Sequence, residues 1–235
     1  VDISLSQLVL DGVSGTVVFV RDISASRALQ RQMQFHATRD AVTGLANRWM
    51  FSQSLQQAFQ QFDRQPGRLA LLLLDLDDFK PINDLHGHGV GDRVLAEAAR
   101  RVCAAVRAAD AVARLGGDEF VVLLRDIEAA GDAVMVAEKI VAALDQPCVV
   151  DGHDIRLGGS IGVAYCPEDA RDAETLMRCA DMAMYRAKSL GRGRCAVYSA
   201  ALAQQIAHRA RVCERLKIAL AQGGLRLHYQ PQVSV

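Results

Sequence analysis

The sequence has no excess of either charge. Its 235 residues contain 27 Lys and Arg and 27 Asp and Glu, so the formal net charge at neutral pH is zero. A balanced chain has no basic field that would attract nucleic acid, and no acidic excess of the kind that keeps chains disordered. We therefore expect a folded chain with no nucleic-acid partner.

Long apolar runs and paired cysteines are also missing. No apolar stretch approaches the roughly 20 residues of a transmembrane helix, and the N-terminus has no signal-peptide pattern. We expect a cytoplasmic segment of a longer protein, without membrane contact of its own; the full-length protein could still be attached to a membrane. The six cysteines are scattered without a Cys-x-x-Cys pair, which disfavours a zinc or redox centre.

What the sequence does contain is an acidic hairpin at residues 114–120, Arg-Leu-Gly-Gly-Asp-Glu-Phe. Short apolar runs lie on both sides, and two adjacent glycines suit a tight turn whose positions need positive φ. The turn presents Asp118 and Glu119, which point to opposite faces because neighbours in a strand alternate. On its own this pattern would be a solvated hairpin tip.

A second acidic group, Asp75-Leu76-Asp77-Asp78, directly follows the apolar residues 69–74. The continuous apolar run predicts a strand buried on both faces. Crowded carboxylates repel one another unless they are neutralised, and hard oxygen ligands favour Mg²⁺, which often binds together with phosphates. We predict that Asp75 and Asp118 converge on one metal–phosphate site that performs phosphoryl chemistry.

The hairpin motif resembles that of the GGDEF family, the diguanylate cyclases. Residues 40–48, 75–80, 83–92 and 180–192 resemble further family blocks in the same order, and the likeness covers roughly residues 36–199. The resemblance implies that two GTP molecules are condensed into cyclic di-GMP and two pyrophosphates at a homodimer interface. It also implies Mg²⁺ as cofactor, with Mn²⁺ as an alternative.

The resemblance assigns metal and catalytic roles by position. The carboxylates of Asp75 and Asp118 and the backbone carbonyl of Leu76 would bind the metal ion. Asp118, Glu119 and Lys80 would be the catalytic residues. Lys80 would contact the terminal phosphates, and Glu119 would bind a second metal ion or help to deprotonate the attacking hydroxyl.

It also assigns the substrate contacts. Asn83 and Asp92 would read guanine, His88 would lie near the base or ribose, and Lys188 and Arg192 would hold phosphates. The residues alone leave alternatives open. Asp92 stands at the start of an apolar helix expected at 92–108 and would be a good N-cap. His88 could be a passive loop residue. Lys188 and Arg192 would also suit the C-terminal end of a helix.

Arg107 and Asp110 precede the central hairpin. At this spacing they would ordinarily form a surface pair on a helix. Their placement ahead of the two glycines resembles the Arg-x-x-Asp inhibitory site of the family, where product binds. The guanidinium fork suits a phosphodiester or the Hoogsteen edge of guanine, so we expect cyclic di-GMP to be both product and inhibitor.

The pattern of elements predicts an α+β fold. The order strand, helix, hairpin, helix, strand resembles a ferredoxin-like, nucleotidyl-cyclase-like βαββαβ core, with helices packed on a mainly antiparallel sheet. Residues 1–22 resemble the tail of a PAS-like sensor domain, and residues 223–235 resemble the start of an EAL phosphodiesterase domain. Between them we expect a linker helix at 23–40, a GGDEF domain at 41–200 and a second linker helix at 201–222.

An alternative function stays open at this stage. The segment could be a catalytically silent module that binds GTP or cyclic di-GMP and regulates the downstream EAL domain. A silent module would not need to keep every metal and base contact. The sequence nevertheless has all of these residues, namely Asp75, Asp118, Lys80, Asn83 and Asp92, which argues against this alternative. Adenylate cyclase chemistry on a similar fold would need a different pair of base-reading residues.

Overall fold

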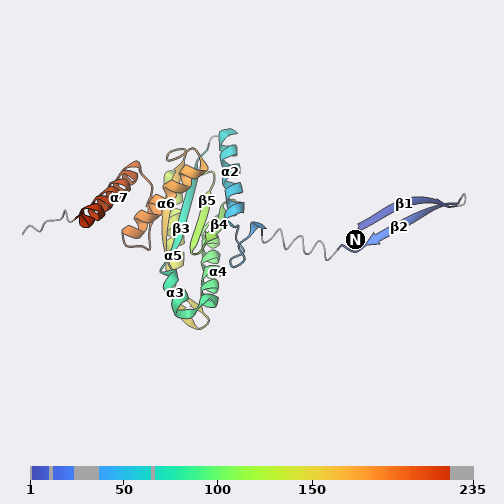
Figure 1. Ribbon diagram of the computed structural model, residues 1–235, viewed down its shortest axis with the longest axis horizontal. Helices are drawn as coiled ribbons and strands as arrows, with labels where there is room; N and C mark the ends of the chain where they lie inside the picture. Colours follow the sequence, from blue (N-terminus) through green and yellow to red (C-terminus); the bar gives the residue numbers. More distant parts are fainter. Residues whose placement is uncertain (1, 11–12, 24–36, 65–66, 223–235) are drawn as a thin grey trace, which may run out of the picture.

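The computed structural model describes residues 2–10, 13–23, 37–64 and 67–222 (Figure 1). Most of the linker helix expected at 23–40, and all of the EAL start expected at 223–235, lie outside these residues. In chain order the elements are β1 (Asp2–Leu10), β2 (Val13–Arg21), α2 (Arg48–Arg64), β3 (Leu69–Asp77), α3 (Phe79–His86), α4 (His88–Ala105), β4 (Ala111–Gly116), β5 (Glu119–Leu124), α5 (Ala130–Asp145), β6 (Cys148–Val150), β7 (His153–Ile155), β8 (Gly158–Cys166), α6 (Ala173–Ser189), β9 (Cys195–Val197) and α7 (Ala200–Ala221).

The central sheet has the strand order β4-β5-β3-β8-β9. The β4–β5, β3–β5 and β3–β8 pairs are antiparallel, and β9 pairs parallel to β8. The four antiparallel strands and the helices that connect them form the ferredoxin-like βαββαβ arrangement. The predicted fold class is therefore confirmed. The hairpin β6–β7 and the edge strand β9 add to this core.

Strand β3 is the centre of the sheet and is buried on both faces, as its continuous apolar run predicted. Leu72 and Leu74 pack with residues of α4 and α5, whereas Leu71 and Leu73 pack with residues of α2 and α6 on the opposite face (Figure 1). Each fully buried leucine contributes roughly 2 kcal/mol. The core therefore fixes the position of Asp75, the first acidic residue after this run.

Helix α6 lies unusually close to the sheet at Gly162 of β8. A Cβ atom at Gly162 would overlap the carbonyl oxygen of Ala180 and the backbone nitrogen of Met184, both in α6. Only a residue without a side chain allows this approach. Gly162 therefore sets the depth at which α6 packs, and with it the position of Lys188 in the last turn of that helix.

The region from Phe79 to Asp92 differs from the sequence prediction. Residues expected to form a loop make helix α3, and α4 begins at His88 with Gly87 as its N-cap. Asp92 therefore lies inside α4, and its predicted N-cap role is wrong. The N-cap reading relied on the apolar residues that begin at Val94, but the helix continues back over the glycine-rich residues because α3 packs against it.

Strands β1 and β2 and the helix α7 lie outside the central sheet. Strands β1 and β2 form an antiparallel hairpin near the N-terminus, and α7 extends from a Ser199 N-cap whose side chain accepts a hydrogen bond from the Leu202 backbone N–H at 3.2 Å. Of the helices in the described part of the chain, none is both long and apolar enough to cross a bilayer.

Candidate active site

The two acidic groups predicted to converge are neighbours in the sheet. Asp75 at the end of β3 lies opposite Glu119 at the start of β5, and the backbone N–H of Leu76 donates to the carbonyl of Asp118 at 3.1 Å. The turn before them has the predicted geometry, since Gly116 and Gly117 both have positive φ. The pairing of β3 with β5 thus brings residues more than forty positions apart to one edge of the sheet.

The carboxylate of Asp75 is in an environment that favours a bound cation. Burial raises its pKa above the ordinary value, and the nearby carboxylates of Asp118 and Asp77 raise it further, while Lys188 acts in the opposite direction. The Nζ atom of Lys188 lies 2.8 Å from Oδ2 of Asp75. Lys188, predicted to hold phosphate, therefore pairs directly with a predicted metal ligand in this structure.

Asp77 has a role that the sequence did not reveal. Its buried carboxylate accepts hydrogen bonds from the Ser160 hydroxyl at 2.8 Å and from the Gly193 backbone N–H at 3.0 Å. The carboxylate thereby holds the loop after α6, in which Arg192 lies with its Nε atom 3.9 Å from Oδ1 of Asp77. Asp77 positions the predicted phosphate-binding Arg192, and no local pattern signals partners so distant in sequence.

Arg192 also ends helix α6. It adopts a left-handed conformation with φ of 60°, and its backbone N–H donates to the carbonyl of Ala187 at 3.2 Å. This is the geometry of a helix C-terminus. The backbone of Arg192 thus belongs to the helix terminus, and its exposed side chain lies near Asp77 and Asp78. Its predicted contact with phosphate stays a prediction.

The donors at this edge of the sheet fit Mg²⁺. Among the described residues, no three His, Cys, Asp or Glu side chains gather closely enough to hold a metal ion unaided. Mg²⁺ usually keeps several waters and binds one or two carboxylates together with substrate phosphates. The carboxylates of Asp75 and Asp118, with the backbone carbonyl of Leu76, would supply the few protein ligands that such a Mg²⁺ ion needs.

The predicted guanine-reading residues lie on the α3–α4 pair. Asn83 Oδ1 is buried and has no hydrogen-bond partner within the described part of the chain. The side chain packs so closely on α4 that a Cβ atom at Gly91 would overlap this oxygen. Asp92 is exposed on the same helix, and His88 is the exposed first residue of α4 and not part of a loop. Lys80 is exposed near the start of α3.

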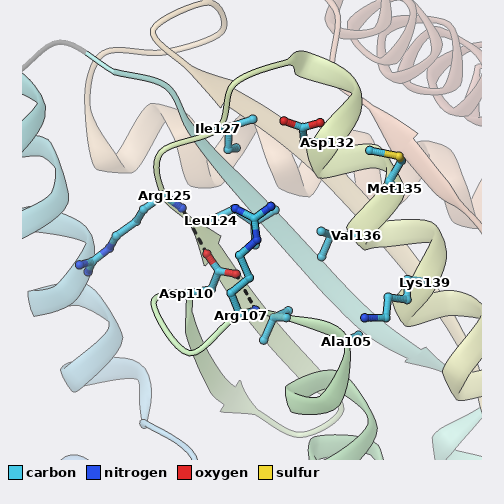
Figure 2. A pocket seen from close by; sticks show the side chains of 11 residues that line it. Ala105, Arg107, Asp110, Leu124, Arg125, Ile127, Asp132, Met135, Val136 and Lys139 are labelled. Carbon is cyan, nitrogen blue, oxygen red and sulfur yellow. Dashed lines mark hydrogen bonds between the residues drawn. The ribbon is translucent and has the colours of Figure 1, made fainter.

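Arg107 and Asp110 do not form a surface pair on a helix, because α4 ends at Ala105. They form a turn in which the Asp110 carboxylate accepts from the Arg107 backbone N–H at 2.9 Å and from the Arg125 backbone N–H at 3.4 Å. Figure 2 shows both residues at a cavity of about 270 Å³, with Lys139 of α5 across from them. The Arg107 guanidinium is exposed there and available to a ligand.

The family model described as "Diguanylate cyclase, GGDEF domain" matches residues 37–194. This chain belongs to the GGDEF family of diguanylate cyclases. The domain is 41% identical, over 231 residues, to the bifunctional diguanylate cyclase/cyclic di-GMP phosphodiesterase MucR of Pseudomonas aeruginosa; the match covers 98% of this chain and 33% of MucR. It is 40% identical over 185 residues to the diguanylate cyclase TpbB of the same organism, covering 78% of this chain and 41% of TpbB.

Solved structures of GGDEF domains have the same fold. A shortened TpbB from Pseudomonas aeruginosa that comprises only the GGDEF domain matches with a TM-score of 0.69 at 38% identity, covering 72% of this chain and 98% of that one. The coiled coil and GGDEF domain of DgcB from Caulobacter crescentus, in complex with c-di-GMP, matches with a TM-score of 0.67 at 28% identity, covering 74% and 93%. The chain spans about a third of the length of MucR, so the GGDEF domain is one part of such a protein.

Proposed function

We propose that this domain condenses two GTP molecules into cyclic di-GMP and two pyrophosphates. The observation that carries the proposal is the meeting of Asp75 and Asp118 at one edge of the sheet, with Lys188 beside them. A Mg²⁺ ion held by Asp75, Asp118 and the Leu76 carbonyl would neutralise the charge that develops on the phosphate oxygens. Lys80, Lys188 and Arg192 supply positive charge for the triphosphate.

In each of the two condensation steps, the 3′-hydroxyl oxygen of one GTP forms a bond to the α-phosphorus of the other. The bond between that phosphorus and the β-phosphate bridging oxygen breaks, and pyrophosphate leaves. Glu119 is the proposed acceptor of the hydroxyl proton. Its carboxylate is partly exposed and lies 3.9 Å from the Arg48 guanidinium.

Asn83 and Asp92 supply what guanine recognition requires. The buried, unpartnered Oδ1 atom of Asn83 is an acceptor without a match in the protein, and an unmatched buried acceptor costs roughly 1–3 kcal/mol. A guanine N–H group would satisfy it. The Asp92 carboxylate, exposed on the neighbouring helix, is a second acceptor for the base, and His88 at the start of that helix is proposed to lie near the base or ribose.

A single site of this kind holds one GTP. The hydroxyl and the α-phosphate that react belong to different nucleotides, so two domains must face each other to align them. We therefore propose that the active form is a homodimer. A PAS-like sensor upstream and an EAL domain downstream complete the proposed protein, and the bifunctional name of MucR supports the second of these.

Product inhibition is proposed to act at the cavity of Arg107 and Asp110. The exposed guanidinium of Arg107 and the amine of Lys139 give this cavity two cations for a phosphodiester (Figure 2). The Asp110 carboxylate, fixed by two backbone N–H groups, holds the turn that presents Arg107. The complex of DgcB with c-di-GMP shows that a related domain binds this product.

The test is incubation of the 235-residue chain with GTP and Mg²⁺, followed by mass analysis of the products. We expect cyclic di-GMP from the wild-type chain and at least a hundredfold lower rate in Asp118→Asn. Asp84→Asn, which removes an exposed carboxylate of α3, is the matched control and should stay active. Tight GTP binding without any product would instead identify a silent regulatory module.

A further inference from the structure

We propose that Lys188 is an internal counter-ion of the metal site, which moves from Asp75 to the triphosphate when nucleotide binds. Metal binding at Asp75 would then depend on nucleotide. The inference rests on the proposed function and adds to it an order of events at the same site. It concerns the protein before substrate arrives, when no phosphate is present to pair with the amine.

The contact between Lys188 and Asp75 is a tertiary one. Lys188 projects from the last turn of α6, and Asp75 is a partly buried residue of β3 between the buried Leu74 and Leu76. The two side chains meet at 2.8 Å. Only 15% of the Asp75 side chain and 34% of the Lys188 side chain are exposed. Partly buried charges attract one another more strongly than those on an open surface, because solvent screens them less.

The acidic edge of the sheet needs a cation whether or not metal is present. Asp75 is partly buried and lies near the carboxylates of Asp118 and Asp77. The Asp77 carboxylate accepts hydrogen bonds from a hydroxyl and a backbone N–H, and its cationic neighbour, the Nε atom of Arg192, is more distant at 3.9 Å. Within the described part of the chain, Lys188 is the cationic side chain paired with Asp75, so it supplies the neutralising charge.

A divalent cation and the Lys188 amine would repel each other if both were bound to the Asp75 carboxylate. An ion bound to Asp75 would lie within a few ångströms of Nζ, where two positive charges in a partly desolvated site repel strongly. Free metal must therefore displace Lys188 without offering the amine another partner. The resting pair lowers the affinity of the empty site for metal.

A bound triphosphate removes that obstacle. The amine sits on a flexible four-carbon chain, and Lys188 lines a cavity of about 490 Å³ together with Asp75, Glu119 and Tyr185. Phosphate oxygens beside this cavity would attract the amine and leave the Asp75 carboxylate free for the metal ion. Because coupling between two ligands is reciprocal, nucleotide raises metal affinity by the same factor by which metal raises nucleotide affinity.

The test measures Mn²⁺ binding at pH 8, without nucleotide and with 3′-deoxy-GTP, which lacks the attacking hydroxyl and cannot react. For the wild-type chain we expect 3′-deoxy-GTP to tighten Mn²⁺ binding at least fivefold. Lys188→Met should bind Mn²⁺ at least fivefold more tightly than wild type without nucleotide, and should lose most of the nucleotide effect. Lys188→Arg keeps the charge and should resemble wild type.

Arg186→Met is the matched control. It removes one positive charge from the same helical turn, but its side chain is exposed and has no part in the Asp75 pair. Circular dichroism verifies that each variant is folded. Nucleotide-free Mn²⁺ binding that is unchanged or weaker in Lys188→Met would overturn the inference. A different result would contradict the proposed function itself: the wild-type chain would bind neither Mn²⁺ nor 3′-deoxy-GTP.

Discussion

The guanidinium of Arg114 links Asp40 to the turn at Gly116 and Gly117. Its Nη1 atom donates to Asp40 Oδ1 at 3.0 Å, and its Nη2 and Nε atoms donate to the Gly117 carbonyl at 2.7 and 2.9 Å. Asp40 in turn accepts from the Thr43 backbone N–H at 2.8 Å and from the Thr43 hydroxyl at 2.7 Å. The start of the GGDEF domain is thus connected by one side chain to the residue that precedes Asp118.

Replacing Arg114 with Met should affect catalysis and stability together. The change leaves the Asp40 carboxylate partly buried without its cation, which costs roughly 2–3 kcal/mol, and frees the turn that positions Asp118. We expect the kcat of Arg114→Met to fall more than its KM changes, both relative to wild type. Urea unfolding of the same variant measures the loss of stability. Arg39→Met removes a more exposed donor to the Gly44 carbonyl and is the control. An unchanged kcat in Arg114→Met would show that the link has no catalytic consequence.

The same pair predicts a pH dependence. Burial tends to raise the pKa of Asp40, but hydrogen bonds from Thr43 and Arg114 outweigh it and hold the pKa below the ordinary value of 3.8. A lowered folded-state pKa stabilises the protein above pH 3.8, and this contribution disappears as pH falls through the folded-state pKa. Asp40→Asn should therefore be less stable than wild type near neutral pH, and the difference should shrink under acid.

Gly91→Ala tests the base-reading role of Asn83 without a large effect on the fold. The new Cβ atom would overlap Asn83 Oδ1, so this side chain must turn away, while alanine is the better helix former by up to about 1 kcal/mol. We expect KM for GTP to rise roughly tenfold, equivalent to about 1.4 kcal/mol, at a nearly unchanged melting temperature.

Gly89→Ala is the matched control for that change. It lies in the same first turn of α4, and its Cβ atom would meet only the end of the Arg93 side chain at an ordinary contact distance of 4.0 Å. It should leave KM as in wild type. Equal KM values in the two alanine variants would contradict a role of Asn83 in binding guanine.

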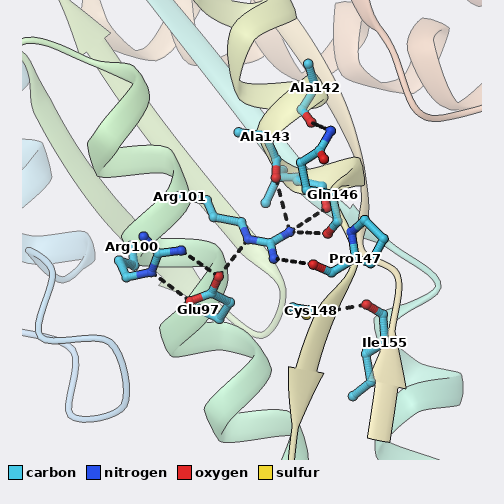
Figure 3. Close-up of polar contacts among 10 residues, drawn as sticks. Glu97, Arg100, Arg101, Ala142, Ala143, Gln146, Pro147, Cys148 and Ile155 are labelled. Atoms are coloured by element: carbon cyan, nitrogen blue, oxygen red, sulfur yellow. Dashed lines mark hydrogen bonds and ion pairs between the residues drawn. The ribbon is translucent and has the colours of Figure 1, made fainter.

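Glu97 and Arg101 form a polar cluster that joins α4 to the end of α5 (Figure 3). The buried Arg101 guanidinium donates to the carbonyls of Ala143, Leu144 and Gln146 at 3.1, 2.9 and 2.5 Å. Hydrogen bonds from Arg100 are the largest influence on Glu97, and with those from Arg101 they lower its pKa to about 2. Because the ordinary value is 4.5, Glu97 stabilises the folded state above pH 4.5.

Glu97→Gln should thus lower the free energy of unfolding at neutral pH. The difference from wild type should decline as pH falls from 4.5 towards 2, as the wild-type carboxylate becomes protonated. Urea unfolding at a series of pH values measures it. Arg101→Met should cost more, roughly 3 kcal/mol, since buried carbonyls and a carboxylate lose their donor. A pH-independent difference for Glu97→Gln would contradict the lowered pKa.

Arg107→Ala should relieve product inhibition without lowering the initial rate. The cavity of about 270 Å³ lies between β5 and α5, away from the Asp75–Asp118 edge, so its loss should not disturb GTP turnover. Progress curves with added cyclic di-GMP should show at least a tenfold higher inhibitory concentration. Arg171→Ala, an exposed arginine outside this cavity, is the control. Inhibition equal to wild type in Arg107→Ala would place the product elsewhere.

The sequence alone determined the elements and the family of this domain. Apolar runs and paired glycines are local properties, so the buried strand β3 and the Gly116–Gly117 turn were predictable from the sequence. The two acidic strand ends were sufficient to predict one shared site. The alternative of an N-cap at Asp92 does not hold, because α4 begins at His88 and packs against α3, so packing overrides local propensity there.

Only the tertiary structure decided which partner each polar side chain has. Asp77 binds Ser160 and Gly193, Lys188 pairs with Asp75, and Arg114 connects Asp40 with the turn. Apart from the contact of Arg114 with Gly117, these contacts join residues from 74 to 116 positions apart. Hydrogen bonds and ion pairs act over a few ångströms in space, and distance along the chain carries no information about them until strand pairing and helix packing bring the groups together.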